Sequence, residues 1–229
     1  MSPFFKTHIG CLFLLFLLAF CPIGRATAQQ LHYKVYSLEE GFPQSEVWFG
    51  SFVKDHEGHL WAGTNGGGVV KFSGDQLQIF TTKDGLISNQ IRAMAVGATG
   101  SIWVVTPIGV SKFDGVSIQS YLDEGKLLQN LNNLGGFPQI AEGLDGKTWL
   151  KTNRNLFVLD KGDSVFRDYT KIQTEFDQAS TRFLTLTKDV DHNIFLTTNT
   201  SNAVWRFNGE RFEREKWVES EDSKGKNIA

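Results

Sequence analysis

Hydrophobic and polar residues alternate in short runs along most of this chain. Between residues 47 and 121 the runs are rich in β-branched and aromatic residues, and turns with glycine or aspartate separate them. Such alternation predicts half-buried strands, whereas no window keeps the 3.6-residue period of an amphipathic helix. We therefore expect two groups of four strands, at residues 47–53, 59–64, 68–72 and 77–80, and at residues 91–97, 101–106, 109–113 and 117–121.

The whole pattern repeats along the chain. A turn followed by an aromatic residue recurs at Trp61, Trp103, Trp149 and Phe195, which are 42, 46 and 46 residues apart. A second aromatic residue ends each unit, at Phe80, Tyr121, Tyr169 and Trp217. Tyr36 is the equivalent residue one unit earlier. Four antiparallel strands that repeat at this spacing are typical of β-propeller blades, so we predict an all-β propeller.

The number of strands predicts an incomplete ring. The propeller would occupy residues 29–217, with an outer strand at 31–36, blades at about 47–80, 91–121, 138–169 and 183–217, and a polar tail at 218–229. The inner strands of units three and four are expected to begin at 138–143 and 183–188. In a closed propeller the first outer strand completes the last blade, but unit four already has an outer strand of its own. We expect further blades downstream, and a closed four-bladed ring is the alternative.

The first 28 residues have the pattern of an export signal. Lys6 precedes a dozen mostly apolar residues, a run that is short for a membrane span. Ala26-Thr27-Ala28 then fits the small-residue rule of signal peptidase, which predicts a cut between Ala28 and Gln29 and a periplasmic or secreted product. Both cysteines precede this cut, so the mature chain would have no thiol. A retained membrane anchor is the alternative.

The composition is that of a soluble chain with a substantial core. Hydrophobic residues make up 41% of the sequence and charged residues 21%, and the formal net charge is −2. Because there is no excess of basic residues to pair with phosphates, we do not expect a nucleic-acid partner.

The longer loops between the predicted strands are the expected ligand site. Amide and guanidinium groups beside a tryptophan suit sugar hydroxyls or carboxylates, and binding sites are often built on such loops. The alternative is that the asparagines only accommodate turn conformations. The predicted ligand-binding residues are Gln44, Ser45, Trp48, Asn65, Asn89, Arg92, Asn153, Arg154 and Asn199.

No metal or cofactor site is predicted. Asp189-Val190-Asp191-His192-Asn193 has the spacing of a calcium loop, but it lacks the glycine and the later glutamate of such loops, so an ordinary turn is the better interpretation. His56 and His59 flank a tight turn with Asp55, and no third or fourth converging ligand is evident from the sequence.

No catalytic residues are predicted either, and we expect that the chain is not an enzyme. A retaining glycosidase needs two carboxylates about 5 Å apart. The acidic residues here fall mostly in predicted turns, and no Ser-His-Asp pattern or phosphate-binding loop is present. A protein-interaction scaffold and a glycan-active hydrolase or lyase remain alternatives, because a fold does not determine a function.

Several segments resemble a known repeat. Residues 36–45 and 80–89 are similar to the "aromatic, then Gly-Leu-Pro-x-Asn" opening of two-component regulator propeller repeats, and residues 55–64 and 109–115 resemble the core that follows it. The resemblance implies an extracytoplasmic sensor that binds a small polar or glycan ligand. It also implies further propeller blades, a membrane-linked kinase module and a possible dimer in a full-length protein.

Overall fold

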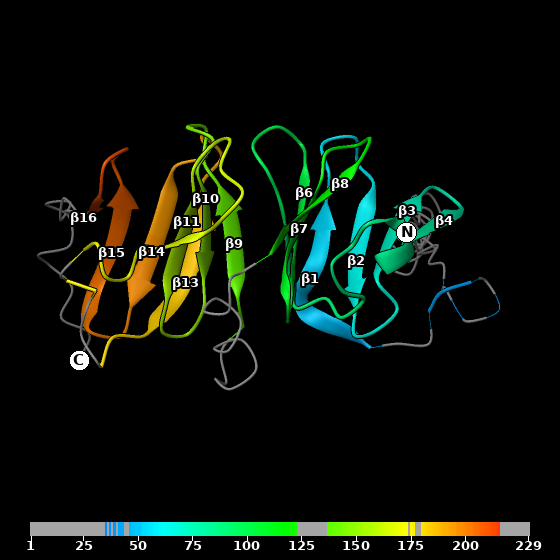
Figure 1. Cartoon of the computed structure of the whole chain (residues 1–229), viewed down its shortest axis with the longest axis horizontal. Coiled ribbons are helices and arrows are strands. Elements are labelled where there is room, and N and C mark those ends of the chain that lie inside the picture. The colour runs from blue at the N-terminus through cyan, green and yellow to red at the C-terminus, as the bar shows by residue number, and fades with distance from the viewer. Residues whose placement is uncertain are drawn as a thin grey trace, which may run out of the picture. The chain divides into compact units, whose positions relative to one another are not determined.

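Four antiparallel sheets make up the described part of the chain (Figure 1). The computed structural model describes residues 35, 37, 39, 41–43, 46–122, 137–173, 175–176 and 180–215. The chain divides into the units Met1–Val35 and Tyr36–Ala229, and all the sheets lie in the second. Their strands are β1 (Val47–Lys54), β2 (Leu60–Thr64), β3 (Val69–Ser73), β4 (Gln76–Phe80), β5 (Ala93–Val96), β6 (Ile102–Thr106), β7 (Gly109–Phe113), β8 (Ile118–Leu122), β9 (Gln139–Glu142), β10 (Thr148–Lys151), β11 (Leu156–Leu159), β12 (Arg167–Asp168), β13 (Phe183–Lys188), β14 (Ile194–Thr198), β15 (Ser201–Phe207) and β16 (Phe212–Arg214).

Each sheet uses four consecutive strands in chain order, as expected for propeller blades. The predicted strands of the first two blades are confirmed, with ends that differ by at most two residues. A 3₁₀ turn, η3 (Thr82–Asp84), follows β4. The described ranges contain no α-helix and no helix that is long and apolar enough to cross a membrane.

The third outer strand is shorter than predicted, and the fourth can be compared with the prediction only in part. β12 has only two residues, and Tyr169 follows it as a buried residue whose amide donates to Leu156 O at 2.8 Å. The predicted end of the fourth outer strand at Trp217, the polar tail and the predicted strand 31–36 all lie outside the described residues.

The turn that joins the first two strands of each blade depends on one left-handed backbone position. Gly58, Gly100 and Gly146 have φ of +91°, +85° and +78°, a region that side chains with a Cβ rarely adopt. In the fourth blade His192 takes this place with φ of 59°. The sequence repeat therefore reflects a repeated turn, which blade four keeps without its glycine.

A tryptophan organises the hydrophobic core between each pair of neighbouring sheets. Trp61, Trp103 and Trp149 are only 2%, 1% and 0% exposed, which confirms that they are interior residues. The ring of Trp61 lies 5.4 Å from that of Phe113 in the second sheet, and the ring of Trp149 lies 4.9 Å from that of Phe212 in the fourth. Sheet stacking therefore relies on these aromatic contacts.

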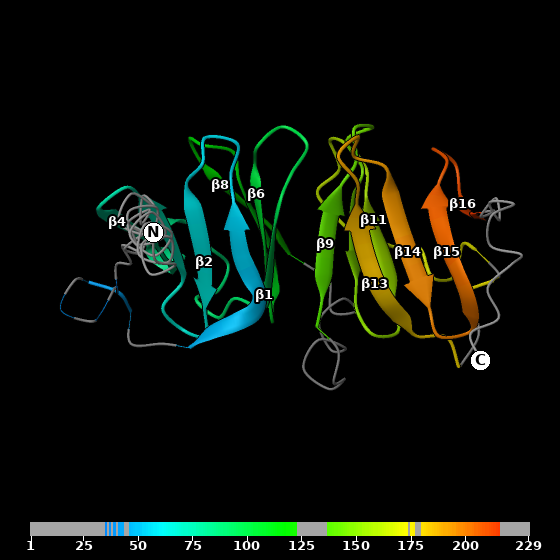
Figure 2. The same cartoon turned by 180° about the vertical axis from the view of Figure 1, so that it is seen from behind.

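The inner strands β1, β5, β9 and β13 are neighbours in that order. Figures 1 and 2 show the first and fourth sheets at the two ends of the series, so the described sheets do not close a ring, as the strand count predicts. The tight turns after the first and third strand of each blade lie at one end of the sheets, the upper end in Figure 1. The turns between second and third strands and the connections between blades lie at the other end.

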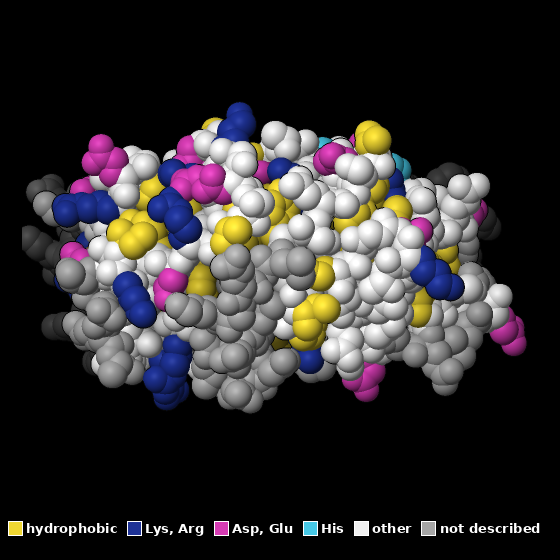
Figure 3. Space-filling view, in the orientation of Figure 1, with side chains coloured by type: hydrophobic (Ala, Val, Ile, Leu, Met, Phe, Trp, Pro, Cys, Tyr) yellow, Lys and Arg dark blue, Asp and Glu magenta, His cyan; other side chains and the backbone are white. Residues whose placement is uncertain are grey.

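Charged side chains of both signs are interspersed on the face seen in Figure 3, rather than gathered into a basic patch. This mixture of charges agrees with the small formal net charge of −2.

Candidate functional site

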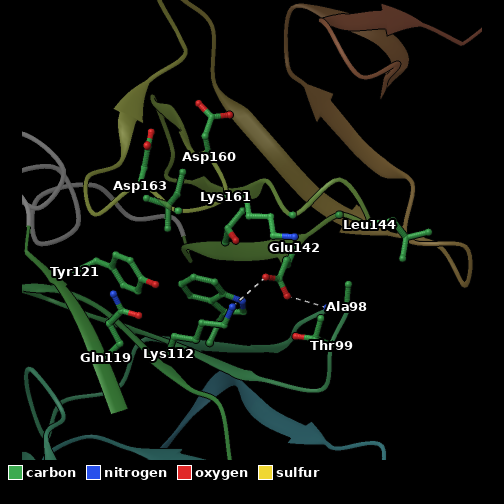
Figure 4. Close-up of a pocket in the computed structure, with 16 residues that line it drawn as sticks. Ala98, Thr99, Lys112, Gln119, Tyr121, Glu142, Leu144, Asp160, Lys161 and Asp163 are labelled. Carbon is green, nitrogen blue, oxygen red and sulfur yellow. Dashed lines mark hydrogen bonds and ion pairs between the residues drawn. The ribbon is translucent and has the colours of Figure 1, made fainter. Parts of the chain in front are cut away.

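A cavity of about 290 Å³ opens between the second and third sheets, at the end where the tight turns lie. Ala98 and Thr99 from the β5–β6 turn line it on one side, and Leu144 from the β9–β10 turn and residues 160–163 line it on the other (Figure 4). Trp103, Lys112, Gln119 and Tyr121 of the second sheet and Glu142 of the third also line it. Polar groups from two blades therefore converge on one space, a common arrangement in ligand pockets.

Glu142, the last residue of β9, connects the two sheets through its carboxylate. Its side chain is 6% exposed, its Oε2 accepts the Ala98 N–H at 2.8 Å, and its Oε1 accepts from Lys112 Nζ at 3.2 Å (Figure 4). The carboxylate can reach this place because residue 97 is a glycine. A Cβ at Gly97 would lie 2.1 Å from Oε2, which is too close for a real contact.

Trp103 supplies an unpaired hydrogen-bond donor at this cavity. Its indole Nε1 is buried and has no hydrogen-bond partner among the described residues. In the first blade, Trp61 Nε1 donates to Asp55 Oδ2 at 2.8 Å. Gly97 stands where the first blade has Asp55, so the second blade lacks that acceptor. An unpaired buried N–H is costly, and the Nε1 atom of Trp149 in the third blade is likewise without a partner among the described residues.

Titratable groups also line the cavity. Lys112 Nζ lies 4.7 Å from the centre of the Trp103 ring, within the range of a cation–π interaction. Lys147 and Arg167 donate to the Asp160 carboxylate and hold its pKa below the usual value. Burial raises the pKa of the Tyr121 hydroxyl, and the negative charge of Glu142 raises it further. At neutral pH the cavity therefore combines carboxylate acceptors, an ammonium group and neutral donors.

Six of the residues predicted from the sequence lie at the opposite end of the sheets, in turns between second and third strands or in connections between blades. Trp48 lies in β1, and its side chain is not among those described; Gln44 and Ser45 lie outside the described residues. Asn65, Asn89 and Arg92 belong to connections of the first two blades, whereas Asn153, Arg154 and Asn199 belong to those of the last two.

The structure brings some of these residues together through the backbone. The amides of Gly66 and Gly68, beside Asn65, both donate to Asn89 O at 3.0 Å. In the last two blades, the Phe183 N–H donates to Asn153 O at 2.9 Å and the Asn199 N–H donates to Arg182 O at 3.0 Å.

Two of the predicted side chains make hydrogen bonds to backbone groups of the loops. Asn89 Oδ1 accepts the Thr82 N–H at 2.8 Å. Asn199 Oδ1 accepts the Arg182 N–H at 2.6 Å, and its Nδ2 donates to Ser180 O at 3.1 Å. These bonds reach backbone groups 7, 17 and 19 residues away, so they connect separate stretches of chain and are not the local bonds of turn-forming asparagines. The ligand role of the whole predicted set stays a prediction.

The sequence did not predict the cavity, because Trp103 and Lys112 lie in predicted strands and belong to no recognisable binding motif. The available signal was the combination of a glycine at position 97, where unit one has aspartate, with Glu142 at the end of an apolar strand. A carboxylate at such a position is expected to be buried and therefore to need a charged or hydrogen-bonding partner. That expectation could have indicated a contact with the neighbouring blade.

Comparison with known proteins supports the fold. Residues 41–66 match the family model described as "Two component regulator propeller", which confirms the resemblance noted in the sequence. The extracellular domain of the putative one component system BT4673 from B. thetaiotaomicron is similar, with a TM-score of 0.54 and 17% identity over 77% of this chain and 26% of that chain. The streptogramin B lyase structure gives a TM-score of 0.53 and 15% identity over 73% of this chain and 54% of that chain.

A catalytically inactive virginiamycin B lyase from Staphylococcus aureus, solved with quinupristin, has a TM-score of 0.51 and 13% identity over 77% of this chain and 60% of that chain. The chain therefore spans about half the length of the lyases and about a quarter of the BT4673 domain. A search of curated proteins found no match. At these identities the likenesses show the fold alone. The chain is thus built of β-propeller blades and carries a two-component regulator propeller repeat at residues 41–66.

Proposed function

We propose that this chain is the extracytoplasmic ligand-sensing part of a two-component signalling protein, and that it binds a small, hydroxyl-rich ligand. The regulator-propeller match and the fold shared with an extracellular domain of a putative one component system support the sensing role. In this proposal the ligand-bound propeller acts on further blades and on a membrane-linked kinase module of the full-length protein.

The observation that carries the proposal is the pairing of an acceptor and a donor in the cavity between the second and third sheets. Glu142 presents a carboxylate, and the neighbouring Lys112 presents an ammonium group 3.2 Å from it. A sugar hydroxyl can donate to the first and accept from the second, because each hydroxyl has both capacities. The cavity volume of about 290 Å³ suits a ligand of one or two sugar rings.

Calorimetric titration with a panel of neutral and acidic mono- and oligosaccharides tests this proposal. For any sugar that binds, Glu142→Gln should weaken binding about tenfold, because a neutral amide replaces a charged acceptor. Lys112→Met should weaken binding by a similar factor, because it keeps the aliphatic chain and removes the donor. Glu210→Gln, at an exposed turn of the fourth sheet, is the control and should leave binding unchanged.

Equal affinity of all variants for the sugar would place the ligand elsewhere, and the residues predicted from the sequence would then be tested in the same way. Analysis of the incubated sugars for cleavage products tests the hydrolase or lyase alternative at the same time. Binding without turnover is the result expected of a sensor.

Export of the chain is a further part of the proposal. Expression in a bacterium with a periplasm should yield a product whose first residue is Gln29, or its cyclised form, because Ala26-Thr27-Ala28 fits the signal-peptidase pattern. Intact-mass analysis of the periplasmic fraction measures this directly. A species that keeps residues 1–28 and fractionates with membranes would instead show that the apolar segment is an anchor.

A further inference from the structure

The turn between β1 and β2 gathers three potential metal ligands. One donor atom each from Asp55, Glu57 and His59 lie within 4.8 Å of one another. His59 Nδ1 is 3.1 Å from Asp55 Oδ2 and 3.2 Å from Glu57 Oε2. Two carboxylates from different residues therefore converge on one imidazole nitrogen.

We propose that Asp55 Oδ2, Glu57 Oε2 and His59 Nδ1 bind a divalent transition-metal ion, with Zn²⁺ as the best fit. Zinc bonds to nitrogen and oxygen are about 2.0–2.2 Å long, which places neighbouring donors of one coordination sphere roughly 3.0–3.5 Å apart. The two separations from His59 Nδ1 fall in that range, and the two carboxylate oxygens lie within 4.8 Å of each other. Ca²⁺ and Mg²⁺ prefer all-oxygen sites, so the imidazole favours a transition metal.

The surroundings hold one ligand in place and leave room for solvent. Asp55 Oδ1 accepts the backbone N–H groups of Glu57 and His59 at 3.0 and 2.8 Å, and Oδ2 accepts Trp61 Nε1 at 2.8 Å. Such outer hydrogen bonds orient ligating carboxylates in known metal sites. The Glu57 side chain is 77% exposed, so water can complete the coordination sphere.

The fourth blade contains a natural comparison. Asp189 Oδ1 accepts the N–H groups of Asp191 and Asn193 at 2.9 Å each, as Asp55 does in the first blade. Asn193 Nδ2 donates to Asp189 Oδ2 at 2.8 Å, in the place of the His59 imidazole. The same turn therefore forms with an asparagine that lacks a metal-binding ring nitrogen. His59→Asn should keep the turn and remove the key ligand.

The sequence had suggested His56, His59 and Asp55 as neighbours without a third ligand. In the structure Glu57 is the third potential ligand, and His56 lies outside the cluster. The Nδ1 atom of His56 instead lies near Gly100 of the second blade, 3.3 Å from where a Cβ on that glycine would be. His56 therefore serves as a matched control, because it is an imidazole of the same turn outside the cluster.

The test is a calorimetric titration of the tag-free, chelator-treated chain with Zn²⁺, together with the visible absorption spectrum of its Co²⁺ complex. We expect Zn²⁺ to bind the unaltered chain and to raise its melting temperature. His59→Asn and Glu57→Gln should each lower the affinity more than about tenfold, a loss typical of damaged metal sites, whereas His56→Asn should not. The intensity of the Co²⁺ bands should fall in the same two variants.

Melting of the metal-free variants shows whether they fold, and His59→Asn should melt like the unaltered chain. The proposal would be overturned if the unaltered chain does not bind Zn²⁺ at 100 µM, a concentration at about the weak end of specific metal sites. Equal losses in His56→Asn and His59→Asn would also overturn it, because they would indicate non-specific binding to surface histidines. Neither result bears on the sugar cavity, which lies between other sheets.

Discussion

Replacing Trp103 with alanine should lower the free energy of unfolding by about 3–5 kcal/mol, the usual cost of removing a buried aromatic side chain. Trp103 is 1% exposed and shares a core with Ile140 and Leu150 of the third sheet. Its ring also lies 5.5 Å from that of Tyr121. The variant loses this packing on both sides of the interface, and chemical denaturation monitored by circular dichroism measures the loss.

Phe52 provides the matched control for this experiment. It is also a large aromatic residue in a strand, but 56% of it is exposed. Phe52→Ala should therefore cost less than about 1 kcal/mol, as surface substitutions usually do. A similarly small loss in Trp103→Ala would contradict the packing of the second sheet against the third.

The stability of the chain should rise with pH above about 8 because of Lys151. This lysine is buried, and burial lowers its pKa from 10.5 to about 8. Between these two values the unfolded chain binds more protons than the folded one, so raising the pH favours folding. Relative to Lys151→Met, the unaltered chain should gain roughly 2 kcal/mol between pH 7 and pH 9.5, since one pKa unit corresponds to about 1.4 kcal/mol.

The comparison with Lys151→Met is needed because other groups also titrate in this range. Lys161→Met, which alters an exposed lysine, should follow the pH profile of the unaltered chain. Lys151 Nζ donates to Leu184 O at 2.9 Å and Phe183 O at 3.3 Å, where the register of β13 and β14 shifts. Parallel profiles of the unaltered chain and Lys151→Met would mean that this lysine keeps an ordinary pKa.

Most of the blade architecture could be predicted because its signals are local. Alternation over four to seven residues predicts strands, and the positive φ of Gly58 and Gly100 explains why glycine recurs in the same turn. The burial of the tryptophans is also predictable. Each of them occupies the same strand position in its repeat, so each should pack against the neighbouring blade in the same way. The short strand β12 could not be predicted in the same way. Its second residue, Asp168, pairs with Phe157 of β11, and no local sequence pattern indicates this pairing.

The candidate site could not be predicted because its contacts join residues far apart in the chain. Glu142 bonds to Ala98, 44 residues earlier, and to Lys112, 30 residues earlier. Neither distance follows from the pattern of one repeat, since the bonds depend on how neighbouring sheets stack. Similarly, the convergence of Glu57 and His59 depends on side-chain directions in one turn, whereas the spacing alone showed only that they are close in sequence.

The carboxylate that Glu142 extends to the second sheet has a consequence for how such a protein can evolve. Propellers grow when a gene segment for one blade is duplicated, which works best while every blade is self-sufficient. Here the second blade has Gly97 where the first has Asp55, and the Glu142 carboxylate of the third blade fills the space beside it and accepts the Ala98 N–H. A duplicate of the first blade inserted in its place would bring an aspartate into space that Glu142 already fills. This contact therefore couples residue 97 of one blade to residue 142 of the next, so a change at either position affects the other.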